Sequence, residues 1–444
     1  MLLHGVPLLT VLLLAAPTAA APPVSRSAAL AADVRALLAK GDVDAVAARF
    51  SPQMAAALPP ERFREFWGGL SAQLGALQSL GEPVVRSEAG VENAWVPATF
   101  ANAVVSLRLF FDAEGRLAGL RVVPGMPPSD WSPAPYADPA KAREREVTVG
   151  SGEWALPGTL TLPAAGSGPY PALVLVHGSG PQDRDETVGG TKVFRDLAGG
   201  LAARGVAILR YEKRTKAHGA RMKGRDVSPK EEVVDDAVAA LALARAQPEV
   251  DPRRVALLGH SLGGMLAPRV ASADGKAAGI VSMAGNTRPP EDLVVDQADH
   301  LVAVGAATAE QAAAQKADVA RLRALKPGSP EAKTATLLGA PASYWLALRG
   351  IDPPAEAKKL GLPVLVLHGG RDYQVTAKDL SGWKAALGDE PRATIRLFPS
   401  LNHLFVAGEG PSTPAEYERP GHVAPEVVEA IAAWALALPP RAAP

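Results

Sequence analysis

The sequence of 444 residues contains no cysteine. The protein therefore has no disulfide bond, no thiol nucleophile and no metal site with cysteine ligands. An excess of charge is also missing, because 46 Lys and Arg residues balance 46 Asp and Glu residues. A net charge of zero gives no indication of a nucleic acid or an anionic membrane as a partner. The densest basic run, at residues 210–216, is interpreted as a solvated loop.

The N-terminus has most features of a secretory signal peptide. Residues 8–16 are apolar, Pro17 follows, and small residues at 18–21 offer a cleavage site. Basic residues before the apolar run are lacking, and the run is short for a membrane span. We predict that residues 1–21 are a cleaved signal peptide, so that the protein is exported to the bacterial periplasm or secreted without a stable membrane anchor. A retained anchor and a mis-assigned start are the alternatives.

The most informative motif is G-x-S-x-G at residues 259–263. An apolar run at residues 255–258 precedes it and an Ala- and Leu-rich stretch follows it. Strand, sharp turn and helix in this order are the context in which the motif forms a nucleophile elbow, with glycines where the turn is crowded. The context predicts that Ser261 is a nucleophile; a glycine-rich tight turn is the alternative. Pro268 is expected to kink the following helix or to end its first segment.

Two later loops carry the acid and the base that a serine nucleophile needs. Asp372 follows a predicted strand at residues 363–368, and His403 follows a predicted strand at residues 393–398. Serine, acid and histidine in this chain order are typical of one class of serine enzymes. Because ligands of open α/β sheets bind at the carboxyl ends of the strands, we expect both loops to lie beside Ser261.

Other titratable residues compete for these roles. His422, near the start of the last predicted helix, is the alternative base. His260 is interpreted as a structural residue turned away from the nucleophile. His368 is interpreted as a packed residue at a strand end, and Asp379 as a solvated charge.

A glycine-rich loop at residues 177–181 follows the apolar strand predicted at residues 170–176. Such a loop supplies one backbone N–H to the oxyanion of acyl transfer, and the residue after the nucleophile supplies the other. The predicted donors are therefore the N–H groups of Ser179 and Leu262. Acyl transfer by this machinery requires no cofactor and no metal.

Four segments together resemble the alpha/beta-hydrolase superfamily of serine hydrolases, and within it the bacterial EstD-type carboxylesterases that carry a small N-terminal α+β domain. The segments are residues 177–186, 209–214, 259–264 and 370–375. The resemblance covers the chain from about residue 144 onward. It implies an α/β fold with a mostly parallel central sheet and flanking helices. It also implies hydrolysis of short to medium acyl esters, with Ser261, Asp372 and His403 as the triad.

The triad does not separate an esterase from a peptidase or a thioesterase, and these remain alternatives. A non-catalytic binding protein on the same scaffold is less favoured. The expected partner is a small-molecule ester, and no feature of the sequence indicates an oligomeric state.

Two domains are predicted from the order of the elements. Residues 26–124 are expected to form a small α+β domain, with helices at 28–38, 43–50 and 61–77 and strands at 84–87, 94–100, 104–111 and 117–123. A proline-rich linker at residues 125–143 leads to a hydrolase domain at residues 144–440. Its further strands are expected at 144–149, 156–162, 206–210 and 278–284, and its helices at 191–204 and 232–246.

An insertion at about residues 286–360 is longer than the usual connection between two strands. Helices are predicted at residues 291–304, 308–325 and 332–348, and we expect them to form a cap over the active site. Tyr344, Trp345 and Tyr373 are candidate substrate contacts; ordinary packing of the cap is the alternative.

Overall fold

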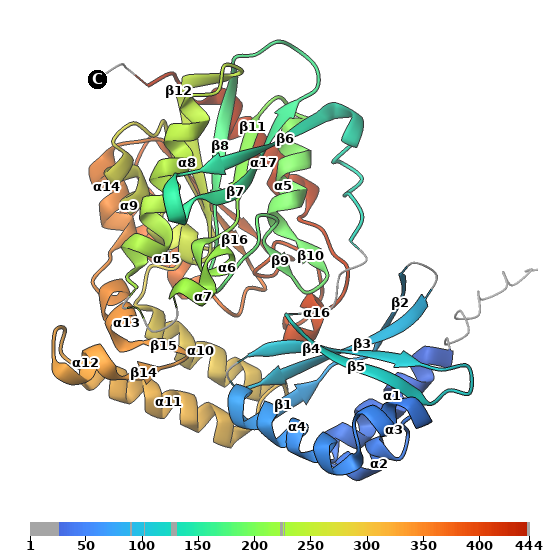
Figure 1. Ribbon diagram of the computed structural model, residues 1–444. Helices are drawn as coiled ribbons and strands as arrows, with labels where there is room; N and C mark the ends of the chain where they lie inside the picture. The colour runs from blue at the N-terminus through green and yellow to red at the C-terminus, as the bar shows by residue number, and fades with distance from the viewer. Residues whose placement is uncertain are drawn as a thin grey trace, which may run out of the picture. The chain divides into compact units, whose positions relative to one another are not determined.

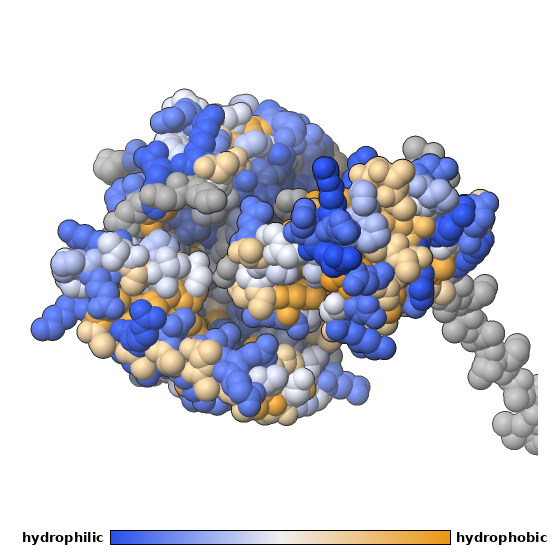
Figure 2. All heavy atoms as spheres, turned by 60° about the horizontal axis from the view of Figure 1, so that its bottom comes forward, coloured by the Kyte–Doolittle hydropathy of each residue, from blue (hydrophilic) through white to orange (hydrophobic). Residues whose placement is uncertain are grey.

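The computed structural model describes residues 26–441 except 89–90, 102, 126–130, 223–224 and 226. The predicted signal peptide at residues 1–21 lies outside the described residues. The chain divides into two compact units, Met1–Pro128 and Ser129–Pro444 (Figure 1). On the face seen in Figure 2, hydrophilic and hydrophobic residues are interspersed.

The described part of the N-terminal unit consists of helices followed by an antiparallel sheet. The helices are α1 (Arg26–Ala39), α2 (Val43–Ala47), α3 (Pro52–Ala57) and α4 (Pro60–Leu74). The strands are β1 (Leu77–Leu80), β2 (Val84–Glu88), β3 (Val91–Phe100), β4 (Val104–Phe111) and β5 (Leu117–Pro124), and β3 pairs with β1, β2 and β4. Phe63, Leu107 and Leu109 are buried in its core. The predicted small α+β domain is therefore confirmed.

Several elements of this unit differ from the prediction. The helix predicted at 43–50 ends at Ala47, and helix α3 and strand β1 were not predicted. The helix predicted to reach residue 77 ends at Leu74, because Gly75 adopts a φ of +83°. A left-handed residue of this kind stops a helix, and only glycine adopts the conformation without a steric penalty. The next residues form strand β1 instead.

The hydrolase unit is built on an eight-stranded sheet within its described residues, in the order β17-β16-β13-β12-β8-β11-β7-β6. The strands are β6 (Ala142–Val149), β7 (Leu156–Pro163), β8 (Tyr170–Val176), β11 (Ala207–Tyr211), β12 (Val250–His260), β13 (Ile280–Met283), β16 (Val364–Gly369) and β17 (Ala393–Phe398). From β11 to β17 all pairs are parallel, and β6 and β7 are antiparallel additions. The predicted mostly parallel sheet is confirmed.

Helices cover both faces of this sheet (Figure 1). On one face lie α8 (Asp235–Arg245), α9 (Leu262–Asp274), α14 (Pro353–Leu360) and α15 (Ala377–Leu387). On the other lie α5 (Val193–Ala202) and α17 (Pro425–Ala437). Coverage from both sides explains why the central strands are continuous apolar runs, whereas the edge strand β17 alternates between half-buried and exposed residues.

Shorter elements complete this unit. They are the 3₁₀ turns η1 (Pro139–Lys141) and η2 (Gly152–Trp154), the hairpin of β9 (Thr187–Val188) and β10 (Thr191–Lys192), α6 (Arg214–Ala217), α7 (Gly219–Met222), the π-helical turn η3 (Lys230–Val234) and α16 (Pro414–Tyr417).

Most of the insertion, residues 286–349, lies below the sheet in the view of Figure 1, in yellow and orange, whereas its last helix, α14, packs on a face of the sheet. Its first helices, α10 (Pro290–Ala303) and α11 (Ala309–Ala324), match the predicted ones closely. The third predicted helix, at 332–348, is wrong. That segment forms α12 (Pro330–Thr334), a hairpin of β14 (Thr336–Leu337) and β15 (Ala340–Pro341), and α13 (Ala342–Arg349). Leu338 and Gly339 adopt φ values of +52° and +78°, which a helix cannot contain.

Pro268 neither ends nor divides helix α9, which continues to Asp274. A proline lacks the N–H that would bond the carbonyl four residues earlier, here that of Gly264. The Ser282 hydroxyl, which is fully buried on β13, donates to the Gly264 oxygen at 3.1 Å. The carbonyl is thus satisfied from the neighbouring strand, and the helix tolerates its proline.

Replacing Ser282 by alanine should lower the free energy of unfolding by about 1–3 kcal/mol, because the buried Gly264 carbonyl loses its partner. In a Pro268→Ala background, the introduced alanine can supply an N–H to the same carbonyl, so the cost of Ser282→Ala should shrink. Urea denaturation of the four proteins of this double-mutant cycle measures both costs. An equal cost in both backgrounds would contradict the explanation.

Candidate active site

Ser261 occupies a sharp turn between strand β12 and helix α9. Its φ and ψ are +53° and −116°, a strained conformation for a non-glycine residue that costs roughly 1–3 kcal/mol. The glycines around it allow the close approach of neighbouring chains. A Cβ atom on Gly259 would lie 2.0 Å from the Gly263 oxygen, and one on Gly263 would lie 2.1 Å from the Val176 oxygen. The turn therefore has the geometry expected of a nucleophile elbow.

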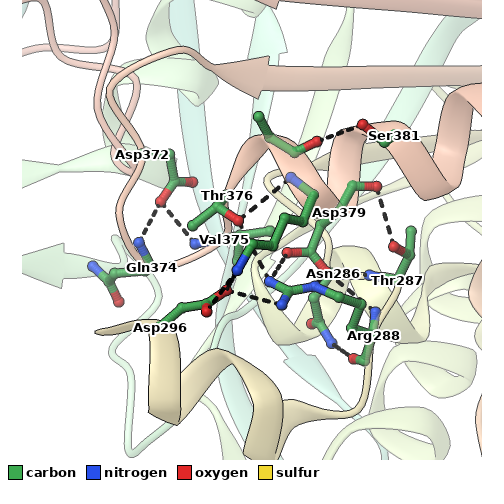
Figure 3. Close-up of polar contacts among 12 residues, drawn as sticks. Asn286, Thr287, Arg288, Asp296, Asp372, Gln374, Val375, Thr376, Asp379 and Ser381 are labelled. Carbon is green, nitrogen blue, oxygen red and sulfur yellow. Dashed lines mark hydrogen bonds and ion pairs between the residues drawn. The ribbon is translucent and has the colours of Figure 1, made fainter. Parts of the chain in front are cut away.

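His403 and Asp372 form a buried pair. His403 Nδ1 lies 2.7 Å from Asp372 Oδ2. The other carboxylate oxygen, Oδ1, accepts hydrogen bonds from the N–H groups of Gln374 and Val375 at 2.8 and 2.9 Å (Figure 3). A histidine whose Nδ1 donates to a carboxylate presents its Nε2 as the proton acceptor.

One cavity of about 790 Å³ is lined both by Ser261 and His403 and by residues of the insertion. Ser261, His403, Leu262 and Ser179 all line it. Leu262 is the first residue of α9, so its N–H is one of those without an acceptor inside the helix. The insertion contributes many of the lining residues, including Pro290, Leu293, Val294, Gln297, Leu338, Pro341, Tyr344, Trp345 and Leu348.

Two comparisons with known proteins identify the family of the chain. Residues 173–419 match the family described as the alpha/beta hydrolase family. The chain is also 37% identical over 386 residues to the esterase EstD of Thermotoga maritima, covering 86% of this chain and 89% of that protein. The chain belongs to the alpha/beta hydrolase family. The resemblance inferred from the four sequence segments is thereby confirmed.

Further matches were found for both units. Residues 31–120 match a family described as a protein of unknown function, DUF3887. The hydrolase is also similar to two solved structures. The Pyrococcus furiosus esterase PF2001 is 14% identical, matches over 70% of this chain and 97% of that one, and has a TM-score of 0.43. Est1E from Butyrivibrio proteoclasticus is 16% identical, matches over 66% of this chain and 97% of that one, and has a TM-score of 0.43.

His422, the alternative base, faces a different acid in the hydrolase. Its Nδ1 lies 3.1 and 3.2 Å from the two carboxylate oxygens of Asp196. Asp196 also accepts hydrogen bonds from the Val423 N–H and the Trp131 indole. Burial raises the pKa of Asp196, against the lowering effect of His422. Since His422 does not line the cavity that contains Ser261, its position does not support it as the base.

His260, interpreted from the sequence as structural, joins two parts of the site. Its Nδ1 lies 3.1 Å from Glu186 Oε2, and its Nε2 lies 3.0 Å from the His403 carbonyl oxygen. Burial would raise the pKa of Glu186 and lower that of His260, but the mutual attraction of the pair reverses both shifts. The attraction favours the charged form of each group, and His260 Nε2 contacts the backbone of His403.

Asp379 is wholly buried, so its interpretation as a solvated charge is wrong. Its carboxylate accepts from the N–H groups of Thr287 and Arg288 at 3.0 and 3.1 Å. The Arg288 guanidinium bonds Asp379 at 2.7 Å and Asp296 at 2.9 Å, and Figure 3 shows it between the two carboxylates. Asp379 thus ties the start of the insertion to the helix that follows the Asp372 loop.

The candidate substrate contacts separate into two places. Tyr344 and Trp345 line the cavity of Ser261, but Tyr373 does not. Tyr373 lines a second cavity of about 300 Å³, where its ring stacks on His300 with centroids 4.6 Å apart. Tyr344 and Trp345 therefore lie where candidate substrate contacts were expected, whereas Tyr373 lines the second cavity together with Asp372.

The basic run at residues 210–216 is not a solvated loop. Arg210 and Lys213 are buried, and Arg210 pairs with Glu144 and Asp185. Sequence reasoning missed these contacts, although residues 177–186 and 209–214 both belong to the segments that carried the family resemblance.

None of the described helices is long and apolar enough to cross a bilayer. Within the same residues, no group of three or more acidic or histidine side chains is arranged to hold a metal ion.

Replacing His403 by asparagine should reduce hydrolytic turnover by on the order of 10⁴-fold or more, because the proton acceptor is lost. The matched change His422→Asn keeps a donor for Asp196 and should leave most turnover per folded molecule. Steady-state assays of both purified variants, normalised by circular dichroism, decide between them. Near-normal turnover of His403→Asn together with loss in His422→Asn would reverse the assignment.

Proposed function

We propose that this alpha/beta hydrolase is a serine carboxylesterase that acts on short to medium acyl esters through Ser261, His403 and Asp372. The observation that carries the proposal is the bond between His403 and Asp372, together with the strained Ser261, which lines the same cavity as His403. Its 37% identity to the esterase EstD supports ester chemistry.

The first half of the reaction forms an acyl-enzyme. Ser261 Oγ attacks the ester carbonyl carbon while His403 Nε2 takes the hydroxyl proton. Asp372 stabilises the resulting imidazolium, since its oxygen already accepts from Nδ1 at 2.7 Å. The N–H groups of Ser179 and Leu262 donate to the oxyanion of the tetrahedral intermediate. The intermediate collapses when His403 returns the proton to the leaving alcohol.

The second half repeats these steps with water. His403 removes a proton from water, whose oxygen attacks the acyl carbon and forms a second tetrahedral intermediate at the same two N–H groups. Collapse releases the carboxylic acid and returns the proton to Ser261. No cofactor and no metal takes part in this proposed sequence.

The insertion is proposed to set the size of the acyl group. Its residues supply apolar lining to the cavity of Ser261, including Leu293, Leu348 and Trp345. The Trp345 indole donates to the Leu337 carbonyl at 2.9 Å, which holds the ring in one orientation. A fixed apolar wall favours acyl chains long enough to contact it.

Replacing Ser261 by alanine should lower hydrolysis of p-nitrophenyl butyrate by on the order of 10⁴–10⁶-fold, with the fold retained. A fluorophosphonate probe should label the unchanged protein at Ser261 and leave the variant unlabelled. More than about a tenth of the activity in pure variant would exclude Ser261 as the nucleophile.

The same proteins can be given aminoacyl p-nitroanilides and acyl thioesters. A preference of the unchanged protein for either class over the p-nitrophenyl esters would replace the esterase proposal by a peptidase or a thioesterase. An unlabelled, inactive wild-type protein would instead favour a binding protein.

Replacing Trp345 by alanine should lower kcat/KM for the octanoyl ester relative to the acetyl ester by about tenfold, because the longer chain loses apolar contact. Trp434→Ala is the matched control, since Trp434 packs against the core beside Gly279 and does not line the cavity. Acetyl, butyryl and octanoyl p-nitrophenyl esters measure the ratio. An equal loss for all three esters would show that Trp345 only stabilises the fold.

A further inference from the structure

The peptide group that carries the Ser179 N–H is held from its opposite side by a buried lysine. Lys213 Nζ donates to the Gly178 carbonyl oxygen at 2.8 Å, and its side chain is only 3% exposed. The Gly178 carbonyl and the Ser179 N–H belong to one planar trans peptide, in which they point in opposite directions. Whatever holds the carbonyl therefore sets the direction of the N–H.

The preceding peptide group, which carries the Gly178 N–H, is held by the acidic side chain of Glu186 rather than by a basic one. The Gly178 N–H donates to Glu186 Oε1 at 2.7 Å, and Glu186 is buried against His260. The space at Gly178 is also limited, because a Cβ atom there would lie 3.2 Å from the Ser261 Cβ. Both peptide planes beside the nucleophile are thus fixed by buried charged side chains.

Lys213 is itself held by a residue that faces the substrate cavity. Its Nζ lies 2.9 Å from Glu232 Oε1, and Glu232 Oε2 accepts from the Tyr344 hydroxyl at 2.5 Å. Burial raises the pKa of Tyr344, with the charge of Glu232 adding to the shift, so the hydroxyl remains a donor. Tyr344 lies on helix α13 of the insertion, and both Tyr344 and Glu232 line the cavity.

We propose that Lys213 is a positioning residue of the oxyanion hole, and that Tyr344 couples the insertion to it through Glu232. The proposal rests on the proposed acyl-transfer function and adds to it the group that aims the Ser179 N–H. The ammonium also polarises the peptide group, which makes its N–H a stronger donor to a developing negative charge.

The test uses the full chain and the double variant Lys213→Met/Glu232→Gln, which removes the charge pair without leaving one charge buried alone. With p-nitrophenyl butyrate, kcat should fall about 10- to 100-fold while KM changes little, somewhat less than for loss of an oxyanion donor. The control Arg214→Met/Asp236→Asn removes a neighbouring ion pair that does not touch Gly178, and its kcat should stay within about twofold.

Two inhibitors separate positioning from a general loss of structure. Ser261 Oγ attacks the carbonyl carbon of an alkyl trifluoromethyl ketone, and the adduct carries an oxyanion. The matching secondary alcohol occupies the cavity without reacting. The inhibition constant of the ketone should rise by the same factor by which kcat/KM falls, and that of the alcohol should not change. Parallel weakening of both inhibitors, or unchanged kcat, would overturn the proposal.

The coupling to the insertion is tested by Tyr344→Phe, which removes one hydroxyl and keeps the ring. This substitution should lower kcat about 3- to 10-fold when it is made alone, and it should have no effect on kcat in the Lys213→Met/Glu232→Gln background. The same loss in both backgrounds would show that Tyr344 acts only on the substrate.

If the double variant does not fold, the variant Lys213→Arg is used in its place, because arginine keeps the positive charge but displaces the donor that contacts the Gly178 carbonyl. An undiminished kcat of this variant would reject the role of Lys213. Failure of the proposed function is distinct from these outcomes, since the unchanged protein would then neither hydrolyse the ester nor bind the ketone more tightly than the alcohol.

Discussion

The close backbone approach at the elbow is the constraint on which the hydrolase unit depends. Strand β12 and helix α9 meet so closely that a Cβ on Gly259 would overlap the Gly263 carbonyl, and one on Gly263 would overlap that of Val176 on β8. This contact brings the end of β8 against the start of α9. The strained Ser261 and the loop after β8 consequently lie side by side, as the proposed chemistry requires.

A loop that offers an N–H to a substrate cannot use that N–H to stabilise itself. In this protein the remaining polar groups around Gly178 are bonded by side chains from distant elements, Glu186 with His260 and Lys213 with Glu232. The base of the insertion is secured in the same way by the buried Asp379. Such buried charges are costly unless each is paired, and removing one partner would therefore disturb the site.

Prediction from the sequence succeeded where a local pattern is strong. Strands β8 and β17 have the predicted bounds. The continuous apolar run of β8 is typical of a strand buried on both faces, and the alternating run of β17 is typical of a strand buried on one face. It failed where a distant group overrides local propensity. Helix α9 contains its proline because Ser282 satisfies the Gly264 carbonyl, and residues 332–348 are broken by a turn with positive φ at Leu338.

The sequence by itself determined the family, the succession of the eight strands of the hydrolase sheet along the chain, and the positions of Ser261, Asp372 and His403 after their strands. Only the tertiary structure decided that His403 meets Asp372 while His422 meets Asp196, and that Tyr373 faces a separate cavity. It alone placed Lys213 against Gly178. The physical reason is that periodicity and turn chemistry act between near neighbours, whereas the pairing of buried charges depends on which distant side chains packing brings within hydrogen-bond reach.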